Sequence, residues 1–159
     1  MATTRSKRSK SYCYEHPRPA VTVDIVLFYP VGNRVEVLLI KRAGEPFKGL
    51  WAFPGGFVDE DESLETAADR ELLEETGLSN IHLEQIGAFG DQGRDPRGHT
   101  VSVVFAAVLD HRARARAADD SADVAWHSAR RPPKLAFDHR KILNLALKKM
   151  ADSLSRHKQ

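Results

Sequence analysis

The chain has 159 residues, of which 42% are hydrophobic and 29% charged, and its net charge is +2. This length fits one compact domain and is too short for two domains of ordinary size. The longest nearly unbroken apolar run, Val101–Leu109, is far shorter than the ~20 residues of a membrane-spanning helix. No apolar signal-peptide segment follows the basic N-terminus, and the single Cys13 excludes an internal disulfide. We therefore expect a soluble cytoplasmic protein without a membrane partner.

Positive charge is concentrated at the N-terminus. Residues 1–20 contain five Lys or Arg residues and one acidic residue, Glu15, so that a basic tail precedes a slightly acidic body. A few cations in a Ser/Thr-rich terminus are usually solvated, and no specific nucleic-acid partner is expected from them. We predict a disordered basic leader at residues 1–13 and a single domain at residues 14–155.

The first half of the predicted domain begins with a β-hairpin. Val21–Tyr29 and Val35–Ile40 have strand composition, and Pro30-Val31-Gly32-Asn33 between them has turn chemistry. Lys41–Trp51 is predicted to be a loop, and Pro54-Gly55-Gly56 a sharp turn.

A helix is predicted to begin at Ser63, which can cap it, with Glu65 placed favourably for the helix dipole. It should end at Gly77, the residue type that suits a left-handed cap, with Leu78 packing back onto the body.

The second half of the chain predicts more strands and a final helix. Ile81–Phe89 and Thr100–Leu109 flank the turn-rich segment Gly90–Gly98, and a charged connection, His111–Asp120, leads to a short strand at Asp123–His127. Asp138 could cap a final helix whose apolar residues have helical spacing: Ile142, Leu143, Ala146, Met150 and Leu154. A sheet with one helix in mid-chain and one at the end indicates a mixed α/β sandwich.

The mid-chain helix carries an unusual concentration of acid. Glu71, Glu74 and Glu75 are three or four positions apart, so they should share one face and repel one another by roughly 0.2–0.5 kcal/mol per pair. A divalent cation would reverse that cost, since clustered carboxylates are hard oxygen ligands suited to Mg²⁺ or Mn²⁺. Arg70 could hold one carboxylate in place. The alternative is a solvated acidic helix surface.

The wider spacing matches a known signature. The segment from Gly56 to Leu78 resembles the Nudix hydrolase signature, Gly-x5-Glu-x7-Arg-Glu-U-x-Glu-Glu-x-Gly-U with U apolar, at all nine specified positions: Gly56, Glu62, Arg70, Glu71, Leu72, Glu74, Glu75, Gly77 and Leu78. The resemblance implies a Nudix-type α/β/α sandwich with a mixed sheet and a catalytic loop–helix–loop. It also implies divalent-metal-dependent hydrolysis of a nucleoside diphosphate linked to another moiety.

The resemblance also assigns roles to residues. Glu71, Glu74 and Glu75, with the backbone of Gly55 or Gly56, would bind metal, and Glu71 is also a candidate base. Glu62 and Arg70 would support the loop and the helix. Mg²⁺ is the expected ion, with Mn²⁺ as an alternative; such ions neutralise a pyrophosphate and lower the pKa of an attacking water.

Flanking segments resemble bacterial ADP-ribose pyrophosphatases and related transcriptional regulators. These segments are residues 18–24, 94–98 and 136–140, and they imply ADP-ribose as a small-molecule substrate, giving AMP and ribose 5-phosphate. Arg94 and Arg97 could contact phosphates or brace their Pro/Gly turn against nearby acids. Arg42 could face the phosphates or be a solvated strand end.

Four further expectations concern residues outside the signature helix and the oligomeric state. Asp120 could assist the metal site or be a solvated turn residue. Trp51, Phe53 and Phe57 should be core or wall residues, although one could stack on adenine. His99 and His139 are expected to be structural rather than catalytic. Enzymes of this type often form dimers, so a homodimer is one expectation for the oligomeric state.

Three functions compete on this basis. The favoured one is ADP-ribose hydrolysis; the second is a Nudix enzyme for another ADP-sugar or a damaged nucleotide. The third is a non-catalytic module that senses ADP-ribose. Against it, we expect no appended DNA-binding domain of the kind that such regulators carry, and all three helix glutamates are present.

Overall fold

The computed structural model describes residues 11–117 and 121–156. Its elements in chain order are β1 (Ala20–Val31), β2 (Arg34–Arg42), β3 (Trp51–Ala52), β4 (Gly55–Phe57), α1 (Leu64–Thr76), β5 (Glu84–Phe89), β6 (Thr100–Val108), β7 (Ser121–Ser128), α2 (His139–Lys149) and α3 (Ala151–Arg156). Within the described residues, no helix is long and apolar enough to cross a membrane.

The strands form one mixed sheet. Its main order is β3-β2-β1-β6-β5, with β4 paired to β1 and β7 paired to β2. The β1–β6 pair is parallel and the other pairs are antiparallel. The predicted hairpin is present as β1 and β2, each slightly longer than expected.

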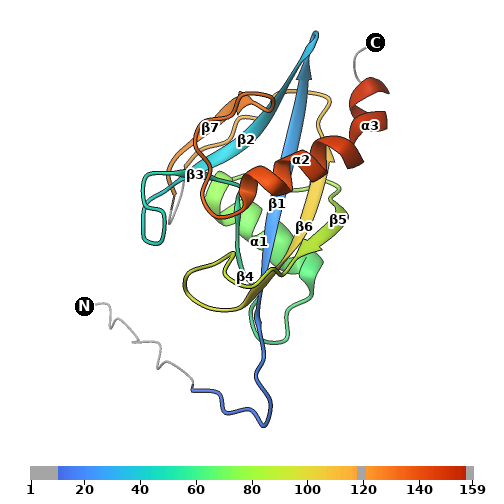
Figure 1. The fold of residues 1–159 in the computed structure, drawn as a ribbon. Helices are drawn as coiled ribbons and strands as arrows, with labels where there is room; N and C mark the ends of the chain where they lie inside the picture. The colour runs from blue at the N-terminus through green and yellow to red at the C-terminus, as the bar shows by residue number, and fades with distance from the viewer. Residues whose placement is uncertain (1–10, 118–120, 157–159) are drawn as a thin grey trace, which may run out of the picture.

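Helices cover both faces of this sheet (Figure 1). Because side chains alternate along β1, Val26 and Phe28 pack in one core with Ile142 of α2, whereas Ile25 and Leu27 pack in another with α1. The structure therefore has the predicted α/β/α sandwich, and β1 lies at its centre.

Helix α1 has the predicted ends. The Ser63 side chain accepts a hydrogen bond from the Thr66 backbone N–H at 3.1 Å, and Gly77 adopts a left-handed conformation with φ of 71°. Leu78 packs against the core beneath α1, as expected.

Three segments of the sheet differ from the sequence prediction. The strand expected from Ile81 begins at Glu84, because Ile81 and Leu83 pack on the core without joining the sheet. The expected loop and turn between residues 41 and 57 contain β3 and β4, which are too short to show a periodic pattern. The short strand expected at 123–127 extends over Ser121–Ser128.

The final helix was also predicted incorrectly as one element. It is two helices, α2 and α3, separated at Met150, and the apolar residues keep their spacing through this break. Asp138 lies at the N-cap position of α2 but makes no side-chain capping bond, because its carboxylate binds Arg94 instead.

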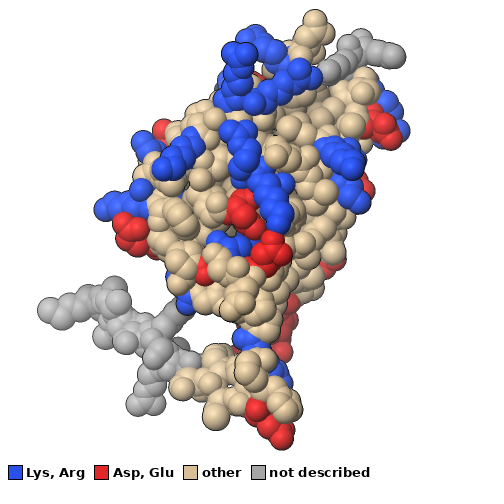
Figure 2. All heavy atoms as spheres, in the orientation of Figure 1, with Lys and Arg blue, Asp and Glu red and all other residues tan. Residues whose placement is uncertain are grey.

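Basic side chains are not confined to the N-terminus. Lys and Arg gather over α2 on the face shown in Figure 2, where Arg140, Lys141, Lys148 and Lys149 are exposed. Of the predicted leader, residues 1–10 lie outside the described part, and Ser11–Cys13 form neither helix nor strand.

Candidate active site

The site is built around a tight approach of β4 to its neighbours. Gly55 and Gly56 pair with Asp24 and Val23 of β1. A Cβ atom on Gly55 would lie 2.1 Å from the Val23 carbonyl oxygen, and one on Gly56 would lie 2.4 Å from a Glu71 carboxylate oxygen. Gly55 therefore cannot carry a side chain without displacing the β1 backbone, whereas a side chain at Gly56 would displace the Glu71 carboxylate.

Glu75 is bound at this turn. Its Oε2 atom accepts the Gly55 backbone N–H at 2.9 Å. Burial, with a smaller contribution from the nearby carboxylates of Glu71 and Asp24, raises the pKa of Glu75 to about 8, and the Gly55 N–H opposes this shift. Glu75 is thus a partly buried acid whose main bond is to a neutral backbone N–H.

Arg70 connects the signature loop to the helix. Its guanidinium binds both carboxylate oxygens of Glu62, at 2.7 and 2.9 Å, and the Phe57 carbonyl oxygen at 3.0 Å. It also donates to Glu71 at 2.7 Å and to Glu74 at 3.2 Å. The bond from Arg70 lowers the pKa of Glu62 to about 2, so this pair stays charged and supports the loop.

The three helix glutamates do not share one environment. Glu71 and Glu75 line a cavity of about 640 Å³, together with Gly56, Arg70 and other residues. The Glu74 side chain is 45% exposed and is bound to Arg70. The structure therefore brings two of the three glutamates into the cavity.

The carboxylates of Glu71 and Glu75 could supply some, but not all, of the oxygen ligands of a divalent cation. Burial raises the pKa of Glu71 even though Arg70 opposes the shift, so Glu71 and Glu75 both lie where added positive charge would be favourable. In the described part of the chain, however, no three Asp, Glu, His or Cys side chains are close enough together to hold a metal ion. A full site therefore needs Glu74, or backbone and water oxygens, as further ligands.

Guanidinium and aromatic groups form the opposite wall. Arg42 ends β2, donates to the Pro46 carbonyl oxygen at 2.7 Å, and lies 5.0 Å from the Phe137 ring centroid. The Arg97 guanidinium lies 4.8 Å from the Phe57 ring and 5.7 Å from the Phe137 ring. Burial and the neighbouring charge of Arg97 lower the pKa of Arg42. Two positive groups therefore face the cavity, and they favour an anion between them.

The two arginines of the Pro/Gly turn are also paired with acids. Arg94 binds both carboxylate oxygens of Asp138, at 2.7 and 3.0 Å, and Arg97 binds Asp95 at 2.7 Å. The Arg94 side chain is only 5% exposed. In this structure it braces the turn against an acid, which is the second of the two alternatives given by the sequence. Arg97, at 42% exposure, is more accessible. A contact of either residue with substrate stays a prediction.

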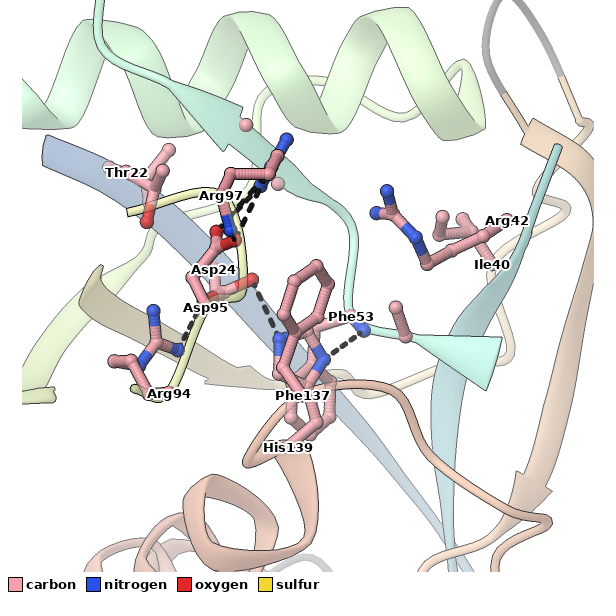
Figure 3. A pocket seen from close by; sticks show the side chains of 14 residues that line it. Thr22, Asp24, Ile40, Arg42, Phe53, Arg94, Asp95, Arg97, Phe137 and His139 are labelled. Carbon is pink, nitrogen blue, oxygen red and sulfur yellow. Dashed lines mark hydrogen bonds and ion pairs between the residues drawn. The ribbon is translucent and has the colours of Figure 1, made fainter. Parts of the chain in front are cut away.

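The sequence analysis did not predict Asp24, which lines a smaller pocket adjoining the cavity. Figure 3 shows Asp24, Arg94, Phe53 and His139 together around the smaller, inner pocket. An ionisable residue within the apolar run of β1 was the available signal, because such a residue is rarely buried without a partner. His139 was named as structural, and it is buried with its Nδ1 atom 3.1 Å from the Phe53 backbone nitrogen.

Other expected residues have varied outcomes. Asp120 lies outside the described residues. Phe53 is buried in the core and Trp51 packs against the same core, whereas Phe57 is exposed beside Arg97. The His99 ring lies 3.1 Å from the Gly90 carbonyl oxygen. His99 is not among the residues that line the cavity with Glu71 and Glu75.

Comparisons with known proteins identify the class. The family model described as NUDIX domain matches residues 18–146. The chain is 43% identical over 126 residues to the ADP-ribose pyrophosphatase of Methanocaldococcus jannaschii, covering 79% of this chain and 71% of that protein. The fold and the sequence together show a Nudix hydrolase domain. The chain belongs to the NUDIX family.

Two further relatives concern ADP-ribose and DNA. The ADPR-responsive transcriptional repressor NtrR of Acinetobacter baylyi is 37% identical over 140 residues, which cover 86% of this chain and 56% of the repressor. The NUDIX domain of Shewanella oneidensis NrtR, solved in complex with ADP ribose, has a TM-score of 0.76 at 35% identity, covering 85% of this chain and 90% of that domain.

A longer NrtR structure from the same organism was solved with a 27mer DNA; it is 34% identical, has a TM-score of 0.68, and 63% of its chain is covered. The expectation that no nucleic acid is involved is therefore not supported by these relatives.

Proposed function

We propose that this domain hydrolyses ADP-ribose to AMP and ribose 5-phosphate. One observation carries the proposal: a single cavity is lined both by the acidic side chains of Glu71 and Glu75 and by the guanidinium groups of Arg42 and Arg97. Binding of a metal-bound diphosphate requires carboxylates that bind the metal ion and hydrogen-bond donors that bind the phosphate oxygens. The M. jannaschii pyrophosphatase and the ADP-ribose complex of NrtR support ADP-ribose as the substrate.

We propose Glu71, Glu74, Glu75 and the backbone of Gly56 as ligands of Mg²⁺, which Mn²⁺ could replace. When bound, the ion would neutralise diphosphate charge and lower the pKa of the attacking water. Glu71 and Glu75 already face the cavity, whereas Glu74 would have to leave Arg70. Arg70, bound to Glu62, keeps the end of the loop fixed to the helix.

The substrate contacts follow from the opposite wall. Guanidinium groups bind phosphate oxygens in a forked geometry that lysine does not offer. Arg42 makes no ion pair with the described carboxylates, so its charge is available to the diphosphate. Arg97 shares its charge with Asp95, and we assign it the second contact. Arg94 and Asp120 complete the proposed substrate-binding set.

A second candidate function is ADP-ribose sensing without hydrolysis. It is favoured by the 37% identity to the ADPR-responsive repressor, of which the chain spans 56%. A third, hydrolysis of another nucleotide, has support from a putative 8-oxo-dGTP diphosphatase of Bacillus subtilis, 35% identical over 106 residues.

The deciding experiment measures AMP release from ADP-ribose by liquid chromatography, with and without Mg²⁺, beside a panel of ADP-sugars and oxidised nucleotides. We expect ADP-ribose to have the highest kcat/KM and EDTA to abolish turnover. Faster turnover of another panel member would replace the substrate. ADP-ribose binding without turnover, together with DNA retention in a shift assay, would establish the sensing function instead.

We propose that the enzyme acts in the cytoplasm. The exposed free thiol of Cys13 is compatible with the reducing conditions there. The homodimer stays a prediction, and light scattering at several concentrations measures it directly.

A further inference from the structure

A buried polar network lies beneath the cavity and outside the signature segment. It begins at Asp24 in the middle of β1, which is 8% exposed. The Ser102 hydroxyl donates a short hydrogen bond to one carboxylate oxygen of Asp24, and the other lies 3.4 Å from His139 Nε2. The second ring nitrogen of His139 lies 3.1 Å from the Phe53 backbone nitrogen. Figure 3 shows the two contacts of His139, one with Asp24 and one with the Phe53 backbone nitrogen.

The hydrogen-bond directions in this network are fixed by its chemistry. A backbone N–H only donates, so His139 Nδ1 accepts from Phe53, and the proton of the neutral ring lies on Nε2 toward Asp24. Burial lowers the pKa of His139, which keeps the ring neutral. Both ring nitrogens and both Asp24 oxygens are therefore engaged.

The network holds one end of a four-residue turn, Phe53–Gly56. The Ile25 backbone N–H donates to the Pro54 carbonyl oxygen at 2.8 Å, so β1 also fixes the middle of the turn. At its far end, Gly55 N–H binds Glu75 at 2.9 Å, and Gly56 lies directly against Glu71. A displacement at Phe53 is therefore transmitted to the two glutamates that face the cavity.

The position of His139 is itself fixed. It is the first residue of α2 and follows Asp138, whose carboxylate binds Arg94 in place of the helix end. The imidazole stacks on the Phe53 ring at 5.0 Å between centroids. Packing alone could be served by an apolar ring, since burying polar groups costs free energy unless each finds a partner. The two engaged nitrogens therefore indicate a geometric role.

We infer that Asp24 and His139 are positioning residues, which place Glu75 and Glu71 through the Phe53–Gly56 turn. This inference depends on the proposed function for its kinetic measurement only. Neither residue needs to touch substrate. Replacing the imidazole by a ring of similar size that cannot form hydrogen bonds should loosen the turn and leave the fold in place.

The test compares His139→Phe with His139→Gln, whose amide can accept from Phe53 and donate to Asp24. The first measurement is amide hydrogen exchange at Gly55 in metal-free protein, as a ratio to exchange at Val104 in the central strand β6. We expect at least tenfold faster Gly55 exchange in His139→Phe. Mn²⁺ affinity, followed by electron paramagnetic resonance, should weaken at least fivefold, and kcat should fall at least tenfold while KM changes less than threefold. His139→Gln should recover most of each loss.

Leu154→Ala is the control, because Leu154 is a buried residue of α3 whose truncation lowers stability, and α3 follows the end of α2 that is remote from His139 (Figure 1). It should leave the Gly55 ratio and the Mn²⁺ affinity within twofold of wild type. Folded His139→Phe with both values within twofold of wild type, or Leu154→Ala with the same losses, would overturn the inference.

The positioning role can still be tested if His139→Phe does not fold or if the wild-type protein does not hydrolyse ADP-ribose. If His139→Phe does not fold, Ser102→Ala removes the hydroxyl that orients Asp24; a two- to fivefold rise of the Gly55 ratio supports the inference, and an unchanged ratio overturns it. If wild-type protein does not hydrolyse ADP-ribose, the proposed function fails, whereas the Gly55 exchange still decides the positioning role.

Discussion

The wall of the cavity and the floor beneath it treat charge in opposite ways. On the wall, Glu71 and Glu75 are partly buried beside each other, and burial raises the pKa of both. In the floor, the carboxylate of Asp138 is matched by the guanidinium of Arg94 at two hydrogen bonds. There the burial of Arg94 is outweighed by its hydrogen bond to Asp138 together with the neighbouring carboxylate charges, which raise its pKa, so the guanidinium stays charged.

This difference separates function from stability. Arg70 already binds Glu71, but the charge of the partly buried Glu75 carboxylate is not matched in this way; burial of such a group costs free energy, and a cation that binds there recovers that cost. A paired floor recovers its cost within the protein and stays rigid. Substitution of Glu71 or Glu75 should therefore remove activity without unfolding the domain, whereas breaking the Arg94–Asp138 pair should lower the free energy of unfolding.

The largest effect is expected for Glu75→Gln. The amide keeps the shape of the side chain and removes a charged metal ligand, so kcat should fall by about 10³ or more at saturating Mg²⁺. Circular dichroism should show an unchanged fold. AMP release from ADP-ribose is the measurement.

The control is Glu65→Gln, which makes the same chemical change on an exposed residue in the first turn of α1. Its kcat should stay within twofold of wild type. Near-normal turnover by Glu75→Gln would refute the role assigned to this glutamate.

Arg42→Ala tests the opposite wall and is expected to have the second largest effect. Loss of one guanidinium contact to the diphosphate should lower kcat/KM by about 30-fold, since a charge-assisted hydrogen bond contributes about 2 kcal/mol. Arg34→Ala, at the other end of β2 and exposed, should leave kcat/KM unchanged. Equal kinetics for the two variants would remove Arg42 from the substrate site.

Arg94→Met tests the floor. It leaves the Asp138 carboxylate half-buried and unpaired, so the free energy of unfolding should fall by about 3 kcal/mol. The double variant Arg94→Met/Asp138→Leu should lose less than the sum of the two single variants. For the surface pair of Arg112 and Glu36, Arg112→Ala should cost about 0.5 kcal/mol. Urea unfolding measures each value, and a similar cost for the two arginines would contradict the contrast between floor and surface.

The parts of the molecule that the sequence predicted share one property: their determinants are close together in the chain. Ser63 and Gly77 mark the ends of α1 through local hydrogen bonds and backbone conformation, so the helix was predicted correctly. The signature lies within 23 residues and identified Glu71 and Glu75 before the structure placed them.

The parts that were missed depend on distant segments. Asp24 and His139 are 115 positions apart, and their contact exists only because α2 packs on the sheet beside β1. Asp138 suits a helix cap by local rules, but Arg94, 44 residues away, binds its carboxylate instead. Strands β3 and β4 are formed by pairing with β2 and β1, which two or three residues cannot indicate by periodicity.

The smallest effect is expected for the pH dependence of protein stability in the absence of metal, to which Glu75 contributes. The pKa of Glu75 is about 8 in the fold and near 4.5 in an unfolded chain, so the folded state holds this proton more tightly. As pH rises from 4.5 to 8, the unfolded state loses its proton first, and metal-free wild type loses stability over that range.

Glu75→Gln cannot lose a proton, so its Tm in EDTA should match that of wild type near pH 4.5 and exceed it by a few degrees at pH 8. Added Mg²⁺ should close or reverse this gap at pH 8, because the ion stabilises the wild-type fold by mass action. A gap that does not change with pH would show that Glu75 is not held in its neutral form, and the contrast between wall and floor would then have to rest on Glu71 alone.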